Sequence, residues 1–322
     1  MYQIYILAIN FCDIYNVIGD MVMKKNNILA SFALLLTGLI WGVSFVAQRA
    51  GSEYVGAFTF NCVRSFLGTL SLLPLVFLPK LFHNDTRKNI QKKLQHKLML
   101  KGGFLCGLAL FTAMSIQQCC MKYVSAGKAG FISALYLIFV PIISVFLGKK
   151  LNKNVIISIF VAVIGLYLLC FKANSMEFNI YDGILLVSAF FYGVHILVVN
   201  YFSQRLNAIK LSCLQFLFVC LLSLPVVLLL EHPTIQAIVS AKVPLLYAGI
   251  LTCGVAYTLQ IFGQKYTQPV IASLILSLES VFAVLGGMLI LGEVMTGREI
   301  LGCVFMIVAV ILSEIQYKTR RV

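Results

Sequence analysis

The sequence predicts an all-α integral membrane protein, with ten transmembrane helices arranged as two inverted five-helix repeats. Its 322 residues are 61% hydrophobic and only 11% charged, with a mean hydropathy of +0.97. One soluble core of this length would not need so much apolar surface. Long apolar runs recur along the chain, and its second half resembles its first at fixed offsets. These observations indicate a membrane protein with an internal duplication.

The predicted helices are runs of roughly 17 to 25 apolar residues, the length that crosses a hydrocarbon core of about 30 Å. They cover residues 28–48, 56–79, 99–119, 128–148, 154–172, 183–200, 211–230, 244–264, 270–291 and 300–317. Helices fit better than barrel strands because a helix satisfies its own backbone hydrogen bonds and because the alternating pattern of barrel strands is absent.

The repeat divides the chain into an N-terminal extension (1–27), a first repeat (28–172), a linker (173–182), a second repeat (183–317) and a cytoplasmic tail (318–322). An offset of 151 residues aligns Trp41 with Tyr192, Cys62 with Cys213, and Pro74 with Pro225. Because each repeat has five spans, an odd number, the second must enter the membrane from the opposite side. Inverted repeats are typical of transporters that alternate between two related conformations around a site at their interface.

Residues 1–22 lack the basic region and the small-residue cleavage site of a signal peptide. A later start at Met23 and an unstructured extension are both compatible with this stretch. We assign the extension no function.

Basic residues set the expected orientation. Eighteen Lys and Arg residues fall on the side that holds both termini and six on the other, with Arg64 inside a span. Cytoplasmic loops carry such an excess, so we expect both termini in the cytoplasm. The net charge of +14 lies mostly in these short connections, so we expect no nucleic-acid partner. The basic stretch 80–97 is expected to lie on anionic lipid, or alternatively to bind a regulatory partner.

Glu279 lies about ten residues, or roughly 15 Å, into the span 270–291. A charge at this depth costs roughly 2.5–3.5 kcal/mol, so it should face a cavity, a partner or a proton source. Its helical face includes Ala272, Ala283 and Gly286. The carboxyl group can handle substrate or a proton, or can form a structural hydrogen bond to a neighbouring helix. The sequence leaves these roles open.

Arg64 is the opposite charge inside the span 56–79, and its face includes Asn61 and Gly68. A guanidinium can hold a substrate carboxylate through two parallel hydrogen bonds, or pair with Glu279 when the site is empty. Extension of the side chain to the membrane surface is the alternative.

Four further residues are candidates for substrate binding or coupling: Trp41, Tyr192, His195 and Gln215. Trp41 and its repeat mate Tyr192 either line a pathway or pack in the core. His195 can relay a proton or hydrogen-bond another helix. Gln215 is the repeat mate of Arg64 at the 151-residue offset.

A second repeated pattern lies near helix ends. An offset of 143 residues aligns Gln117, Lys122 and Tyr123 with Gln260, Lys265 and Tyr266. Inversion would place these sets at opposite ends of the molecule, where they are either matching gates or ordinary interface anchors. Two pairs of glycines four residues apart, Gly38 with Gly42 and Gly103 with Gly107, predict close helix contacts.

Enzymatic and metal-binding patterns are missing from the sequence. It has no GxSxG, Walker A or HExxH motif. Its ten cysteines form no CxxC pair, so we interpret them mainly as packing residues. We therefore expect no enzyme activity, no cofactor and no metal site. Without a nucleotide-binding loop, any driving force would come from an ion gradient.

Three segments carry a family resemblance: "LTGLIWGVSFVAQRAG" (36–51), "LYLIFVPIISVFLGKKL" (135–151) and "LSLESVFAVLGGMLILGE" (276–293). The chain resembles the drug/metabolite transporter superfamily, specifically tandem EamA-domain proteins, from about residue 28 to 317. The resemblance implies a ten-helix inner-membrane carrier of amino acids, nucleosides or other small metabolites. Ser280 stands where the family often has Pro after the Glu, and Lys150 where a second acid is common.

These inferences together predict a secondary transporter of a small polar metabolite, such as an amino acid, working by alternating access and exporting its substrate. Its partners would be the lipid bilayer and the substrate, and proton coupling and a homodimer stay open. The alternatives are a non-coupled facilitator, a membrane-embedded sensor and a subunit of a flippase for lipid-linked intermediates.

Overall fold

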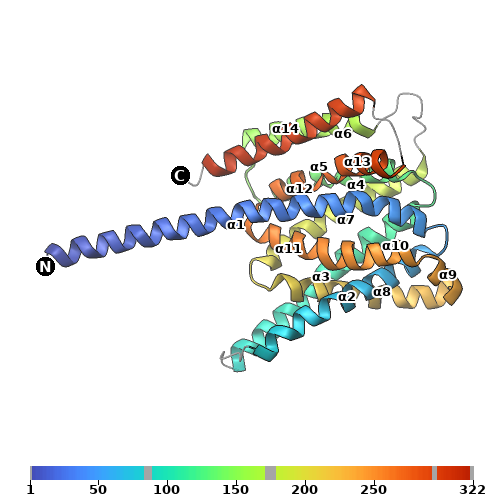
Figure 1. Ribbon diagram of the computed structural model, residues 1–322, viewed down its shortest axis with the longest axis horizontal. Coiled ribbons are helices and arrows are strands. Elements are labelled where there is room, and N and C mark those ends of the chain that lie inside the picture. The colour runs from blue at the N-terminus through green and yellow to red at the C-terminus, as the bar shows by residue number, and fades with distance from the viewer. Residues whose placement is uncertain (1, 83–88, 171–178, 292–295, 320–322) are drawn as a thin grey trace.

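The computed structural model describes residues 2–82, 89–170, 179–291 and 296–319, and within these ranges the regular structure is entirely helical (Figure 1). The first half contains α1 (Tyr2–Gly51), α2 (Ala57–Phe82), α3 (Asn89–Cys120), α4 (Ala126–Ala134), α5 (Tyr136–Phe146) and α6 (Lys153–Cys170). The second half contains α7 (Ile180–Ser203), α8 (Ala208–Val226), η1 (Val227–Glu231), α9 (Ile235–Ser240), α10 (Lys242–Leu246), η2 (Tyr247–Ala256), α11 (Tyr257–Tyr266), α12 (Pro269–Leu276), α13 (Glu279–Leu291) and α14 (Gly297–Thr319). The segments η1 and η2 are π-helical.

Apolar helices dominate this architecture. By length and composition, seven helical stretches of the described residues could cross a membrane, and many of their large apolar side chains face outward. The seven are residues 27–51, 57–77, 93–120, 126–146, 180–203, 208–231 and 242–266. Two shorter apolar helices cover residues 153–169 and 269–285. A multi-pass membrane protein is therefore the class that these helices define.

The helices run between two ends of the bundle. We call one the basic end, where α11 ends at Tyr266 and α12 begins at Pro269, and the other the α9 end, where α9 lies between η1 and α10. The start of α1 and the end of α14 lie on the same side of the molecule (Figure 1). The N-terminal extension is part of α1, which begins at Tyr2. The linker around 171–178 and the loop at 83–88 lie outside the described residues.

Two expected helices are interrupted. The sequence predicts continuous spans over 128–148 and 270–291, but α4 gives way to α5 at Leu135 and α12 gives way to α13 after Leu276. In the second break, the hydroxyl groups of Ser273, Ser277 and Ser280 each donate to the carbonyl oxygen three residues earlier, at 2.8 Å. Such bonds offer the backbone an alternative to the helical ladder. The 143-residue offset aligns Leu135 with Leu278, so the breaks are repeat-related.

Glycines allow the helices to approach closely, as the sequence predicts. A Cβ atom at Gly42 would lie 2.6 Å from the carbonyl oxygen of Glu279, so α1 packs directly against the start of α13. Cβ atoms at Gly103 and Gly107 would lie 2.6 Å from the Cβ of Leu214 and 2.8 Å from the carbonyl oxygen of Gln215. The small residues therefore bring the backbones of α1 and α3 against second-half helices.

Candidate functional site

A small cavity lies at the centre of the bundle, among side chains from both halves. Its volume is about 30 Å³, room for a water molecule or two. It is lined by Trp41, Ser44, Phe45, Gln48, Arg64, Gln117, Ser133, Tyr136, Tyr192, Thr252, Tyr257 and Glu279. Most of these side chains carry a polar atom, although apolar helices surround them. A metabolite would require this central cavity to expand.

Glu279 reaches the cavity because the helix breaks just before it. It is the first residue of α13, its side chain is 3% exposed, and its Oε1 has no hydrogen-bond partner. Tyr136, the first residue of α5, lies beside it, and its hydroxyl group interacts with the carboxyl group. The 143-residue offset aligns Tyr136 with Glu279. The two broken helices thus bring equivalent residues, one hydroxyl and one carboxyl, to the same cavity.

Arg64 supplies a buried cation from α2. Only 2% of the residue is exposed, and its Nε and Nη2 atoms have no hydrogen-bond partner. Its guanidinium lies 5.3 Å from the ring centroid of Phe60, within range of a cation–π interaction. The side chain does not extend to the surface, and no ion pair joins it to Glu279 within the part of the chain that the structure describes. A guanidinium and a carboxyl group therefore line one cavity with unused hydrogen-bonding capacity.

Aromatic side chains form part of the cavity wall. The rings of Trp41 and Tyr257 lie 4.7 Å apart between centroids, and the indole Nε1 of Trp41 has no partner. The hydroxyl group of Tyr192 donates to Oε1 of Gln117 at 2.8 Å, and Nε2 of Gln117 donates to the hydroxyl oxygen of Ser133 at 2.7 Å. Trp41 and its repeat mate Tyr192 thus both line the cavity while packing in the core.

His195 and Gln215 form a separate polar pair near the cavity without lining it. Nε2 of His195 lies 3.1 Å from Oε1 of Gln215, and both residues are buried. The imidazole ring is 5.9 Å from the ring of Tyr257 between centroids. Both sequence candidates therefore bond to each other, and His195 also contacts the ring of Tyr257, which lines the cavity.

A column of polar groups that the sequence pattern did not predict extends from the cavity toward the α9 end. The hydroxyl group of Thr252 donates to that of Ser44 at 3.1 Å, and Nε2 of Gln48 donates to the same oxygen at 3.3 Å. Nε2 of Gln118 donates to the carbonyl oxygen of Gln48 at 3.1 Å. Ser44 and Gln48 recur at helical spacing after Trp41, which was the available signal. Thr252 lies in the π-helical segment η2, which the sequence pattern does not mark.

The expected gate residues do not form two compact sets at opposite ends. Gln117 lies in the central cavity, and Gln260 is fully buried with neither polar side-chain atom bonded. At the α9 end, Lys122 is exposed and Tyr123 stacks on Tyr181, with 4.2 Å between ring centroids. Lys265 and Tyr266 line a second cavity at the basic end. Their gating role stays a prediction.

This second cavity, which we call the vestibule, has a volume of about 640 Å³. It is lined by Asn27, Ser144, Lys149, Lys150, Leu151, Asn200, Gln204, Lys265, Tyr266, Thr267, Gln268, Pro269 and Val270.

Across the described residues, no group of three or more His, Cys, Asp or Glu side chains is placed to hold a metal ion. The thiol sulfurs of Cys62 and Cys220 lie 3.7 Å apart, between α2 and α8.

Apolar helices around a charged central cavity are the features of a membrane transporter. The chain belongs to the EamA-like transporter family, whose model matches residues 28–171 and 179–315. It is 30% identical over 288 residues to an uncharacterized transporter of Archaeoglobus fulgidus, covering 89% of this chain and 86% of that one. It is 26% identical over 304 residues to the uncharacterized transporter YoaV of Bacillus subtilis, covering 88% and 96%.

The fold also occurs in a solved structure. A crystal structure of another protein superimposes with a TM-score of 0.71 at 16% identity, covering 91% of this chain and 99% of that one. At this identity the match concerns the fold alone. The protein is thus a multi-pass membrane protein of a transporter family.

Proposed function

We propose that the protein is a secondary transporter that exports a small zwitterionic metabolite, of the amino-acid type, by alternating access. The observation that carries this proposal is the central cavity, which holds a cation and a carboxyl group that are not paired with each other. Buried charges are costly unless they are paired. A ligand with its own carboxylate and ammonium groups would supply both partners, at Arg64 and Glu279 respectively.

The chemistry of the cavity supports this substrate class. The planar guanidinium of Arg64 suits a carboxylate because its donors match the two oxygens. The carboxylate of Glu279 and the hydroxyl oxygen of Tyr136 would both accept hydrogen bonds from the ammonium group. Trp41 and Tyr257 offer aromatic surface for an apolar side chain of the substrate.

The proposed architecture has ten transmembrane spans in two inverted repeats, with both termini in the cytoplasm of the cell's inner membrane. The repeat-related breaks at Leu135 and Leu278 support it, because discontinuous helices often bring their ends to a transport site. The vestibule at the basic end would then face the cytoplasm, which supports entry of cytosolic substrate and hence export.

Proton coupling is the proposed driving mechanism, with Glu279 as the group that exchanges the proton. Its carboxyl group is buried without a cationic partner, so proton binding and substrate binding would compete for the same oxygens. The absence of a nucleotide-binding motif in the sequence fits a gradient-driven carrier.

The first test is thermal unfolding of the purified protein in detergent with a panel of amino acids, nucleosides and drug-like cations. A ligand that binds the folded state raises the unfolding temperature by mass action. We expect a saturable rise with zwitterionic amino acids that Glu279→Gln abolishes and that exposed Glu53→Gln keeps. Equal shifts in wild type and Glu279→Gln would remove Glu279 from the site, and shifts only with nucleosides or cations would overturn the substrate class.

The direction of transport and its coupling to protons are tested by transport assays in proteoliposomes. Accumulation of the identified amino acid should follow an imposed pH gradient in wild type and fail in Glu279→Gln. Accumulation that ignores the pH gradient would reject proton coupling and leave a facilitator.

A further inference from the structure

The vestibule is walled by residues of five helical segments at the basic end. Asn27 comes from α1, Asn200 from α7 and Lys265 from α11, while Ser144 and Val270 belong to α5 and α12. At about 640 Å³ it is far larger than the central cavity. This volume lies in the range of sites for small organic ligands.

Three lysines give the vestibule its charge. Lys149, Lys150 and Lys265 line it, and none of the acidic side chains that the structure describes does. The acidic residues whose side chains the structure describes lie elsewhere: Glu279 at the central cavity, and Glu53, Asp182, Glu231 and Glu299 in segments at the α9 end. A concave site lined by one sign of charge concentrates ions of the other sign.

The backbone adds to this positive potential. Helix α12 begins in the vestibule wall at Pro269, and its N-cap residue Gln268 makes no side-chain hydrogen bond to the first turn. The C-terminus of α11, in contrast, is bonded by side chains. Gln204 donates to the carbonyl oxygen of Lys265 at 2.8 Å, and Asn200 donates to that of Gln264 at 3.1 Å. Helix N-termini attract anions and C-termini repel them. In the vestibule wall, the N-terminus of α12, which attracts anions, has no side-chain cap. The C-terminus of α11, which repels them, is covered by side-chain donors.

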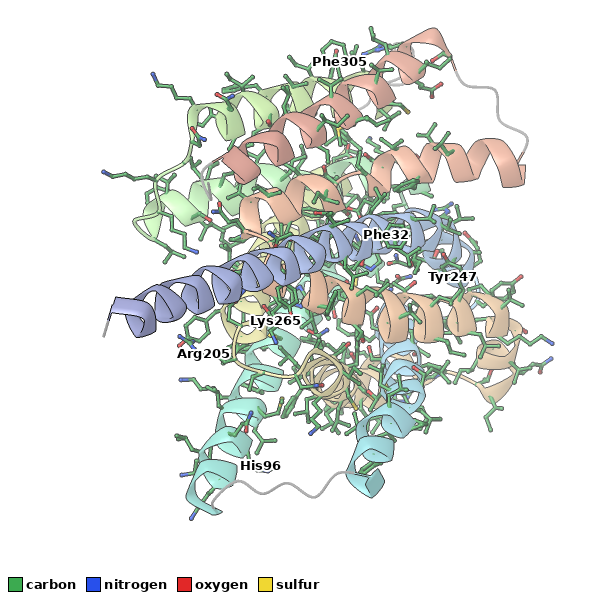
Figure 2. The ribbon with its side chains drawn as sticks, turned by 60° about the vertical axis from the view of Figure 1, so that its left-hand side comes forward. Phe32, His96, Arg205, Tyr247, Lys265 and Phe305 are labelled. Atoms are coloured by element: carbon green, nitrogen blue, oxygen red, sulfur yellow. The ribbon has the colours of Figure 1, made fainter. Side chains whose placement is uncertain are left out.

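The general excess of lysine on cytoplasmic surfaces does not explain why three lysines line this one cavity. Lys101 of α3 and Lys210 of α8 lie in the parts of their helices nearer the basic end, but they do not line the vestibule. Figure 2 labels Lys265 and Arg205 toward the end from which α1 extends, and Arg205 instead lies 4.2 Å from the ring centroid of Tyr201. Only some of the lysines at the basic end therefore line the vestibule.

We propose that the vestibule is a binding site for a phosphate group, separate from the central cavity. Lysines at the rim and the free N-terminus of α12 are the groups that bind phosphates as point charges and backbone donors. The phosphate can belong to a soluble phosphorylated metabolite or to the headgroup of an anionic phospholipid. The site goes beyond the proposed transport of a zwitterion, because its residues are not those of the central cavity.

The test compares two triple variants that lose the same charge. The vestibule variant carries Lys149→Gln, Lys150→Gln and Lys265→Gln. The control carries Lys101→Gln, Lys210→Gln and Lys242→Gln, none of which lines the vestibule. Inorganic phosphate is titrated against each protein in detergent, at ionic strength held constant with sodium chloride, and the unfolding temperature is recorded.

We expect a saturable phosphate-dependent rise in wild type and in the control, with an apparent affinity at least about tenfold weaker in the vestibule variant. The corresponding Lys→Arg triple should keep the effect, which separates lost charge from misfolding. An equal rise in both triple variants, or no saturable rise in any arm, would overturn the proposal.

A lipid arm identifies the source of the phosphate. Wild type and both triple variants are placed in nanodiscs of phosphatidylcholine with and without phosphatidylglycerol, in phosphate-free buffer. Stabilisation by phosphatidylglycerol that only the vestibule variant loses would assign a headgroup, whereas a vestibule-dependent effect confined to free phosphate would assign a soluble ligand. Glu279→Gln should keep either effect, so failure of the transport proposal and failure of this one are distinguishable.

Discussion

Arg64 and Arg49 differ in how far hydrogen bonds satisfy their guanidinium groups. Its Nε and Nη2 atoms are buried without hydrogen-bond partners. Arg49, by contrast, donates to the carbonyl oxygens of Met121 and Val124 at 2.6 and 3.3 Å. A residue retained for stability would resemble Arg49, because an unsatisfied buried charge is destabilising. The unsatisfied guanidinium of Arg64 instead fits the proposed role in ligand binding.

This contrast predicts opposite effects of removing the two charges. Arg64→Met should leave the empty protein as stable as wild type or more stable, by up to about 1–4 kcal/mol, because it removes an uncompensated buried charge. Arg49→Gln should destabilise it by roughly 1.5 kcal/mol through lost charge-assisted hydrogen bonds. Unfolding temperatures in detergent measure both effects.

The same samples test binding. Arg64→Met should lose the amino-acid-induced rise in unfolding temperature and Arg49→Gln should keep it. A destabilised Arg64→Met protein that still responds to ligand would show that Arg64 is structural.

At the scale of helices, the position of Glu279 depends on how closely α1 approaches α13. A Cβ atom on residue 42 would lie 2.6 Å from the Glu279 carbonyl oxygen and 2.8 Å from the backbone nitrogen of Ala283. Both are backbone atoms, so the first turn of α13 must shift. Gly42→Ala should therefore destabilise the protein by about 1–3 kcal/mol and weaken ligand binding by displacing Glu279.

Gly183→Ala is the matched control for this change. Gly183 also lies within a helix, but a Cβ atom there would meet nothing within 4 Å. The control should be neutral or stabilising by about 0.4–1 kcal/mol. If thermal unfolding and ligand titration give the same result for both variants, the close approach at Gly42 does not position Glu279.

The positions of the helices could be predicted from the sequence, but the helix break before Glu279 could not. Apolar runs predicted where helices lie, because burial in lipid requires long apolar segments with few charges. The interruption before Glu279 was not predicted, because it depends on serine hydroxyl groups that bond the backbone in place of the ladder. The convergence of Arg64 and Glu279 depends on the packing of α2 against η2 and of α13 against α1, which no periodicity encodes. Tyr136 was missed although the 143-residue offset pairs it with Glu279.

At the scale of the whole molecule, the two ends differ in how the halves are joined. At the α9 end, Lys128 Nζ lies 2.7 Å from Asp182 Oδ2, which joins α4 to the start of α7. The carboxylate of Glu231 accepts hydrogen bonds from the backbone nitrogens of Phe58 and Thr59 at 2.9 and 2.7 Å. Both contacts connect the first half to the second. The basic end holds the open vestibule instead, so alternating access would require the α9-end contacts to break.

These contacts predict how the protein can be driven toward the other conformation. The double variant Asp182→Asn and Glu231→Gln removes both charges, weakening the ion pair with Lys128 and the capping of α2. A lost helix cap costs about 0.5–2 kcal/mol, enough to change the ratio of two conformations several-fold. We expect faster backbone hydrogen exchange at the starts of α2 and α7 and unchanged exchange at α12. The exposed pair of Arg49 and Glu53, at 3.7 Å, supplies the control Glu53→Gln, which should leave exchange unaltered because such pairs contribute little. If exchange at the α9 end does not increase in the double variant, these contacts do not hold that end closed, and a different part of the interface between the repeats must separate during transport.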